Sequence, residues 1–103
     1  MRILKFGERN IKLSFEEPET IELLEATVHK SLVNIIGIVP RISEIAAMLV
    51  CGSEVMDKKE AYELFKVYEG GVYAVAGQIN EELRETGWLG IVDTQAKDEN
   101  GKN

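Results

Sequence analysis

The sequence predicts a mainly α domain that opens with a β-hairpin, an α+β fold with about four helices in one compact unit. Over the first fifteen residues, apolar positions alternate with polar ones, as in half-buried strands. From residue 18 onward they recur at spacings of three and four, as in amphipathic helices. We expect one domain over residues 1–92 and a disordered tail over 93–103, because the tail is polar and has nothing to bury.

The hairpin is expected at about residues 2–15. Apolar side chains occupy every second position on both sides of a turn at 7–10, where Gly7 and Asn10 can adopt the positive φ of tight turns. A lone hairpin is marginal in water, so helices should cover its apolar face. The residues of that face are Leu4, Phe6, Ile11, Leu13 and Phe15.

The first helix is expected to begin around Pro18 and to end near Gly37 and Pro40. Proline presets φ in a first helical turn, and the neighbouring carboxylates favour the positive end of the helix dipole. A single apolar stripe runs through this segment at helical spacing: Ile21, Leu24, Val28, Leu32 and Ile35.

A second helix is expected from Ile42 to Gly52. It is apolar on most of its circumference, so it is either the central helix of the core or half core and half partner surface. A third helix follows a capping box, in which Asp57 accepts from first-turn amides and Glu60 reaches back. Its buried face is predicted to comprise Ala61, Leu64, Phe65 and Tyr68.

Gly70-Gly71 predicts a break before the last helix, because each glycine weakens a helix by about 1 kcal/mol relative to alanine. The last stripe comprises Val72, Val75, Ala76, Ile79 and Leu83, and the polar face, expected mostly in solvent, comprises Glu81, Glu82, Arg84 and Glu85.

The end of that helix is expected at Gly87, in the left-handed conformation. Trp88 and Leu83 then occupy the two positions that touch in a Schellman motif. Trp88 therefore has two interpretations, as a helix stop or as part of a binding surface.

Composition argues against several classes of function. The net charge of −6 repels phosphate backbones, so we expect no nucleic-acid binding. The longest apolar run is far shorter than the roughly 20 residues that cross a bilayer, and no signal peptide is recognisable. We therefore expect a cytoplasmic protein that does not associate with a membrane. With one histidine, His29, and one cysteine, Cys51, the chain offers no catalytic, metal or cofactor constellation, and we expect a protein that is not an enzyme.

The remaining candidate for function is apolar surface. Four helices of this kind carry more apolar stripe than one small core readily hides, and the excess could serve as a groove for a partner helix. The partner-binding candidates are Tyr62, Tyr73, Trp88 and Leu89. The alternative is that such side chains simply fill the core.

The order of elements resembles the small tail assembly chaperones of long-tailed, siphovirus-type bacteriophages. The resemblance covers roughly residues 3–91 and rests on order and spacing. It is carried by the opening Phe6-Gly7-Glu8-Arg9-Asn10-Ile11-Lys12-Leu13-Ser14-Phe15, by Leu23-Leu24-Glu25, by the helix, double glycine and helix around Gly70-Gly71, and by the ending Thr86-Gly87-Trp88-Leu89-Gly90.

The resemblance implies a non-catalytic phage or prophage protein of the host cytoplasm. Such a protein binds the tape measure protein, keeps it soluble and helps to recruit tail tube subunits. A homo-oligomer is also considered, since self-association along the partner would strengthen binding through effective concentration. Two other classes stay open: a small regulatory or adaptor protein of mobile-element origin, and a minor structural component of the virion.

Overall fold

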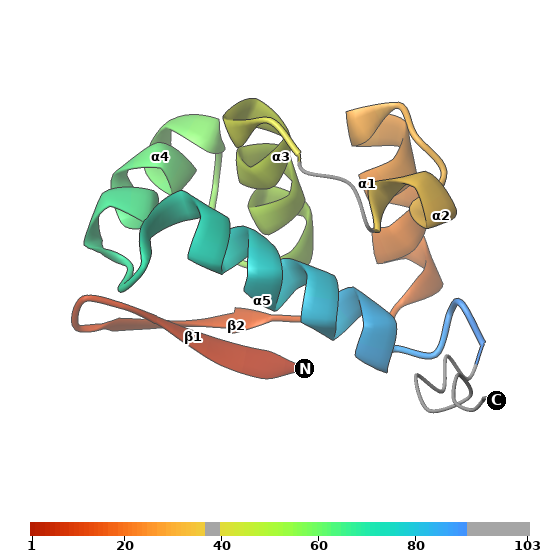
Figure 1. Ribbon diagram of the computed structural model, residues 1–103, viewed down its shortest axis with the longest axis horizontal. Helices are drawn as coiled ribbons and strands as arrows, with labels where there is room; N and C mark the ends of the chain where they lie inside the picture. The colour runs from red at the N-terminus through yellow and green to blue at the C-terminus, as the bar shows by residue number, and fades with distance from the viewer. Residues whose placement is uncertain (37–39, 91–103) are drawn as a thin grey trace, which may run out of the picture.

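The computed structural model describes residues 1–36 and 40–90, and within them it shows a β-hairpin followed by five helices (Figure 1). This confirms the predicted mainly α fold with an N-terminal hairpin. The predicted tail and the last two residues of the predicted domain lie outside the described residues. The elements are β1 (Arg2–Phe6), β2 (Arg9–Leu13), α1 (Pro18–Val28), α2 (Leu32–Ile35), α3 (Ile42–Gly52), α4 (Lys58–Val67) and α5 (Gly71–Glu85).

Helix α3 is the central helix of the core. It stands between α1 and α4 and also contacts α5, which crosses between these helices and the hairpin (Figure 1). Ile45, Ala46 and Leu49 on α3 are fully buried, whereas Ile42 at its start is exposed. The first of the two expectations for this helix is therefore confirmed.

The hairpin turn is tighter than predicted. Phe6 pairs with Arg9, so the turn consists of Gly7 and Glu8 alone, and Gly7 has a φ of 66°. Glycine at the first central position suits the two-residue turns whose twist matches that of the strands. The expectation of a positive φ at Asn10 was wrong, because this residue lies within β2. The predicted apolar face is confirmed: Leu4, Phe6, Ile11, Leu13 and Phe15 are all buried.

The first predicted helix is in fact two. Helix α1 ends at Val28, because His29 adopts the left-handed conformation with φ 59°. Helix α2 then begins at Leu32, whose amide donates to the Glu25 carboxylate at 2.6 Å. Leu32 and Ile35 remain buried, so the apolar spacing continues across the turn and conceals it. The described part of this segment is helical only to Ile35, and Gly37 lies outside the described residues.

Local caps define the second half of the chain. The Asp57 carboxylate accepts from the Glu60 amide at 2.9 Å, as predicted. The Glu60 carboxylate reaches back one residue further than a capping box requires and accepts from the Met56 amide at 2.7 Å. The break at Gly70-Gly71 is confirmed, since both residues have positive φ and α5 begins immediately there.

Candidate functional site

An apolar hollow lies where the start of α3, the outer face of α4 and the first turn of α5 meet. We call it the α4 hollow. Its volume is about 300 Å³. The Gly70-Gly71 turn forms it, because that turn sends α5 back along α4. The lining residues are Ile42, Tyr62, Phe65, Lys66 and Val72.

The floor of the α4 hollow is fixed and its walls are accessible. Phe65 is buried and packs edge-on against Tyr62, with ring centroids 6.3 Å apart. Tyr62 keeps 36% of its surface exposed, and Ile42 keeps 47%. The one charged lining residue, Lys66, lies 3.5 Å from Glu63 in an exposed ion pair. The hollow is thus an apolar surface for a side chain, with charges at its rim.

The structure does not bring the four predicted partner-binding residues together. Tyr62 lines the α4 hollow, and Tyr73 is exposed beside the lining residue Val72. Trp88 and Leu89 lie past the opposite end of α5, about 22 Å away at 1.5 Å per residue.

The other apolar lining residues belong to the predicted stripes. Phe65 was expected on a buried face and is buried, whereas the partial exposure of Ile42 and Val72 was not predicted. Ile42 and Val72 lie in the first turns of their helices, where a stripe extends beyond the elements that cover it. An apolar residue in the first turn of a helix was the one feature of the sequence that could have indicated this exposure.

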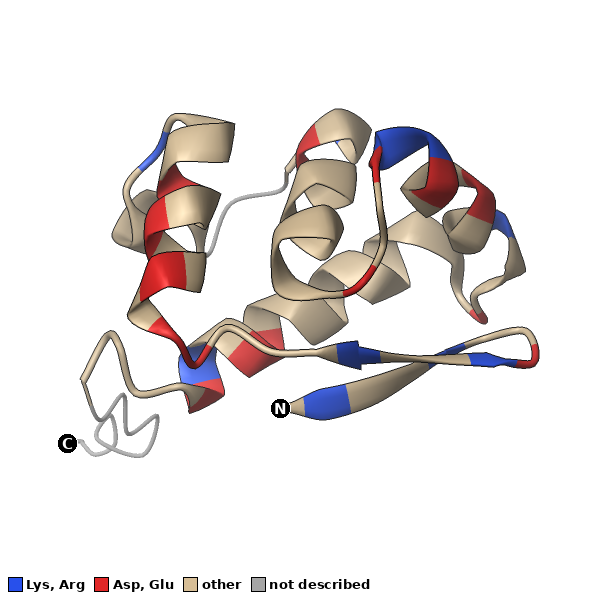
Figure 2. Ribbon diagram, turned by 180° about the vertical axis from the view of Figure 1, so that it is seen from behind, with Lys and Arg blue, Asp and Glu red and all other residues tan. Residues whose placement is uncertain are grey.

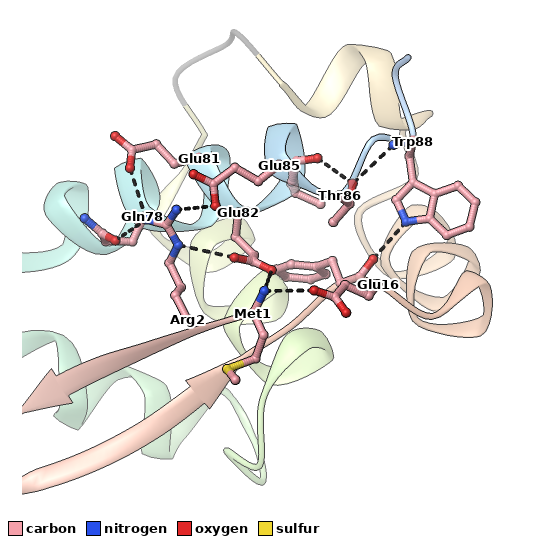
Figure 3. A network of polar contacts seen from close by, with 11 residues as sticks. Met1, Arg2, Glu16, Gln78, Glu81, Glu82, Glu85, Thr86 and Trp88 are labelled. Atoms are coloured by element: carbon pink, nitrogen blue, oxygen red, sulfur yellow. Dashed lines mark hydrogen bonds and ion pairs between the residues drawn. The ribbon is translucent and has the colours of Figure 1, made fainter. Parts of the chain in front are cut away.

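Trp88 is tied into the fold although it remains partly exposed. Its indole Nε1 donates to the carbonyl oxygen of Phe15 at 2.9 Å (Figure 3). Its amide donates to the Thr86 hydroxyl at 3.3 Å, and that hydroxyl donates to the Leu83 carbonyl at 2.7 Å. Gly87 has the predicted left-handed conformation, with φ 86°. These contacts give Trp88 a structural role at the end of α5.

An ionic cluster joins the first two residues of the chain to α5. The Arg2 guanidinium donates to four side chains that lie along one face of the helix (Figure 3). The Met1 amine lies 2.6 Å from Glu82 Oε2 and 2.9 Å from Glu16 Oε2. The acceptors of Arg2 are Gln78, Glu81, Glu82 and Glu85.

The placement of Glu82 corrects the expectation that it lies in solvent. Its side chain is only 1% exposed. A buried carboxylate is costly unless its charge is compensated, and Arg2 and the Met1 amine supply that compensation. Glu82 in turn raises the pKa of the Met1 amine above its usual value, followed in effect by Glu16. The cluster therefore ties the first two residues of the chain to α5.

A second hollow, of about 410 Å³, lies beside β2 and contains the only cysteine. Burial raises the pKa of the Cys51 thiol, although the hydrogen bond to Thr27 Oγ1, 3.7 Å from Sγ, lowers it. The thiol form is a poor nucleophile, since the thiolate is the reactive species.

Within residues 1–36 and 40–90, no helix has the length and apolar character needed to cross a membrane. In the same ranges, no cluster of three or more histidine, cysteine or acidic side chains could hold a metal ion. Comparisons of the chain with models of protein families, with curated proteins and with solved structures found no match.

Proposed function

We propose that this protein is a non-catalytic tail assembly chaperone of a long-tailed bacteriophage. In this proposal it binds the tape measure protein in the host cytoplasm, keeps it soluble and helps to recruit tail tube subunits. The tape measure protein is a long helical protein, so its segments carry repeated apolar stripes that need cover before the tail assembles.

The observation that carries the proposal is the α4 hollow. It offers an apolar floor at Phe65 and exposed apolar walls at Ile42 and Tyr62. An amphipathic helix binds such a surface by inserting one or two apolar side chains, and the aromatic wall supplies contact area at low entropic cost. The resemblance over residues 3–91 supplies the kind of partner.

The test is co-expression with the tape measure protein of the same phage or prophage. We expect the soluble fraction of that protein to rise several-fold when the chaperone is present. Ile42→Asp should abolish the gain, because it places a carboxylate in the α4 hollow. The same change favours the first turn of α3, where acidic residues complement the helix dipole, so the variant should remain folded.

Val33→Asp is the matched control. Val33 is an exposed apolar residue on α2, which lies on the side of the molecule away from α4 (Figure 1). This variant should solubilise the tape measure protein as well as the wild type does. If the wild-type chain leaves the solubility of the tape measure protein unchanged, the proposal is wrong.

Two observations separate this function from its alternatives. A chaperone gene should lie between the tail tube gene and a very long tape measure gene, whereas a regulatory or adaptor gene has no such constraint. A chaperone should also be missing from purified particles, whereas a minor structural component should be found in them.

A further inference from the structure

Charge is segregated between two exposed faces of the molecule. Residues 2–13, which span the hairpin, contain four basic residues and one acidic residue. Helix α1 contains three glutamates and no lysine or arginine. Figure 2 shows the basic bands on the hairpin and the acidic bands on α1, in separate parts of the molecule.

The basic face is the side of the hairpin turned away from the core. We call it the hairpin outer face. Lys12 lies directly opposite Ile3 in the register of the hairpin, and Lys5 is two residues further along β1. Ile3 is therefore an exposed apolar residue, 56% accessible, with a lysine on each side. The residues of this face are Ile3, Lys5, Asn10 and Lys12.

The acidic face is the exposed side of α1, which we call the α1 outer face. Residues three and four apart lie on the same side of a helix, so Glu22 and Leu23 both lie beside Glu19. Leu23 is 55% exposed. The α1 outer face thus repeats the arrangement of the hairpin outer face with the opposite charge. Its residues are Glu19, Glu22, Leu23 and Ala26.

Neither face is neutralised within the molecule. Across residues 1–36 and 40–90, Lys5, Lys12, Glu19 and Glu22 take part in no ion pair. The other two basic residues of the hairpin are occupied, since Arg2 binds α5 and Arg9 lies 2.7 Å from Glu60. Among the described residues, the two lysines that flank Ile3 and the two glutamates beside Leu23 thus have no ion-pair partner.

We propose that the hairpin outer face of one copy binds the α1 outer face of a second copy. Two lysines then meet two glutamates while Ile3 packs against Leu23. Because the two faces differ, the contact is head-to-tail: each copy keeps one face free for the next, which gives a ring or an open series. Such an array would present the α4 hollow at regular intervals, but the contact itself does not depend on the proposed function.

Sedimentation equilibrium of the purified full chain tests the contact. An interface this small is weak, so we expect the mean mass to rise at concentrations on the order of 100 μM. The rise should be present in about 20 mM salt and lost in about 1 M salt, where the screening length is roughly 3 Å. A wild-type chain that stays monomeric in low salt would overturn the proposal.

Charge reversal identifies the faces. Lys5→Glu with Lys12→Glu, and separately Glu19→Lys with Glu22→Lys, should each abolish association. The chain that carries all four changes should regain it, because the faces are again complementary, and a mixture of the two double variants should associate as well. Restoration is a result that loss of folding cannot produce. If the fourfold variant stays monomeric while its circular dichroism is native, the assignment of faces is wrong.

Lys58→Glu with Lys59→Glu is the control for net charge. Both lysines are exposed at the start of α4 and make no ion pair among the described residues, so the change alters net charge as much as the hairpin variant does. Association should be retained. Loss of association in this control would show a general charge effect and would count against the two faces.

Discussion

The indole Nε1 of Trp88 donates a hydrogen bond of 2.9 Å to the backbone carbonyl of Phe15, so the end of α5 is fastened to the segment that leaves β2. In the same region, the backbone carbonyl of Gly52, the last residue of α3, accepts a hydrogen bond of 2.8 Å from the Ser14 amide. The segment after the hairpin is thus held by two helices that come from distant parts of the sequence.

The first prediction concerns the Trp88 bond itself. Trp88→Phe keeps an aromatic ring and removes the donor, so the Phe15 carbonyl loses its partner. We expect the free energy of unfolding, measured with urea, to fall by about 1 kcal/mol. Trp88→Ala should cost more, because the apolar contact is lost as well. Tyr73→Phe is the control: Tyr73 is exposed, so this change should leave the free energy of unfolding unchanged. If Trp88→Phe also leaves it unchanged, the hydrogen bond does not contribute to stability.

The second prediction compares two glycines in helices. A Cβ at Gly52 would lie 2.7 Å and 2.8 Å from two atoms of the Phe15 ring, which is fully buried. Gly52→Ala should therefore destabilise the fold by about 1–3 kcal/mol, as overpacking does. A Cβ at Gly77 on α5 would meet nothing within 4 Å. Gly77→Ala should instead stabilise it by up to about 1 kcal/mol, from helix propensity alone. The opposite signs are the test, and thermal melts of both variants would measure them.

The third prediction concerns the buried carboxylate. Arg2→Met keeps an apolar stem but leaves Glu82 with the Met1 amine as its only cationic partner. Breaking a buried pair from one side costs about 3 kcal/mol when the remaining charge has no partner. Because the Met1 amine still compensates part of the Glu82 charge, we expect a loss of up to about 3 kcal/mol in urea unfolding. Arg2→Lys should restore only part of the loss, because an ammonium cannot reproduce the planar fork that reaches several acceptors.

A double variant separates loss of the pair from loss of packing. Replacing both members of a buried ion pair with apolar residues is often close to neutral, so Arg2→Met with Glu82→Met should be more stable than Arg2→Met alone. Arg84→Met is the control for removing an arginine from a surface position. A double variant that is less stable than Arg2→Met alone would contradict this account.

Local signals in the sequence were sufficient for most of the secondary structure. Alternation gave the hairpin, the Asp57 cap gave the start of α4, and Gly70-Gly71 gave the break before α5. The turn at His29 left no such signal, because Leu32 and Ile35 continue the apolar spacing across it. A histidine in the left-handed conformation is uncommon. Here the Glu25 carboxylate stabilises the turn by accepting a hydrogen bond from the Leu32 amide.

Long-range contacts explain what the sequence did not predict. In the sequence Glu82 resembles a surface residue, and its burial depends on Arg2, 80 positions earlier, and on the Met1 amine. The α4 hollow is of the same kind. Its residues come from three helices, and the open space depends on which parts of each stripe the neighbouring helices leave uncovered.

The fourth prediction is an acid-sensitive component of stability at Glu44. The hydrogen bond from Lys30, followed by the one from the Arg41 amide, holds the pKa of Glu44 below its usual value of 4.5. The folded state thus binds the proton more weakly than the unfolded state, so the contribution of this group is complete above about pH 4.5 and is lost as the pH falls through the lower, folded value. Glu60 acts in the same direction, because the Met56 amide and then Arg9 lower its pKa.

Urea unfolding of the wild type and of Glu44→Gln, measured at several pH values between about 6 and 3, tests this linkage. The wild type should be the more stable chain at the upper end, and the difference should shrink toward the lower end. In chains that also carry Lys30→Met, the difference in stability between Glu44 and Gln at this position should be smaller, because loss of the main hydrogen bond lets the pKa of Glu44 rise toward its usual value. A linked proton must change the slope of the free energy of unfolding against pH. If the difference in stability between wild type and Glu44→Gln does not change with pH, the carboxylate acts only through packing.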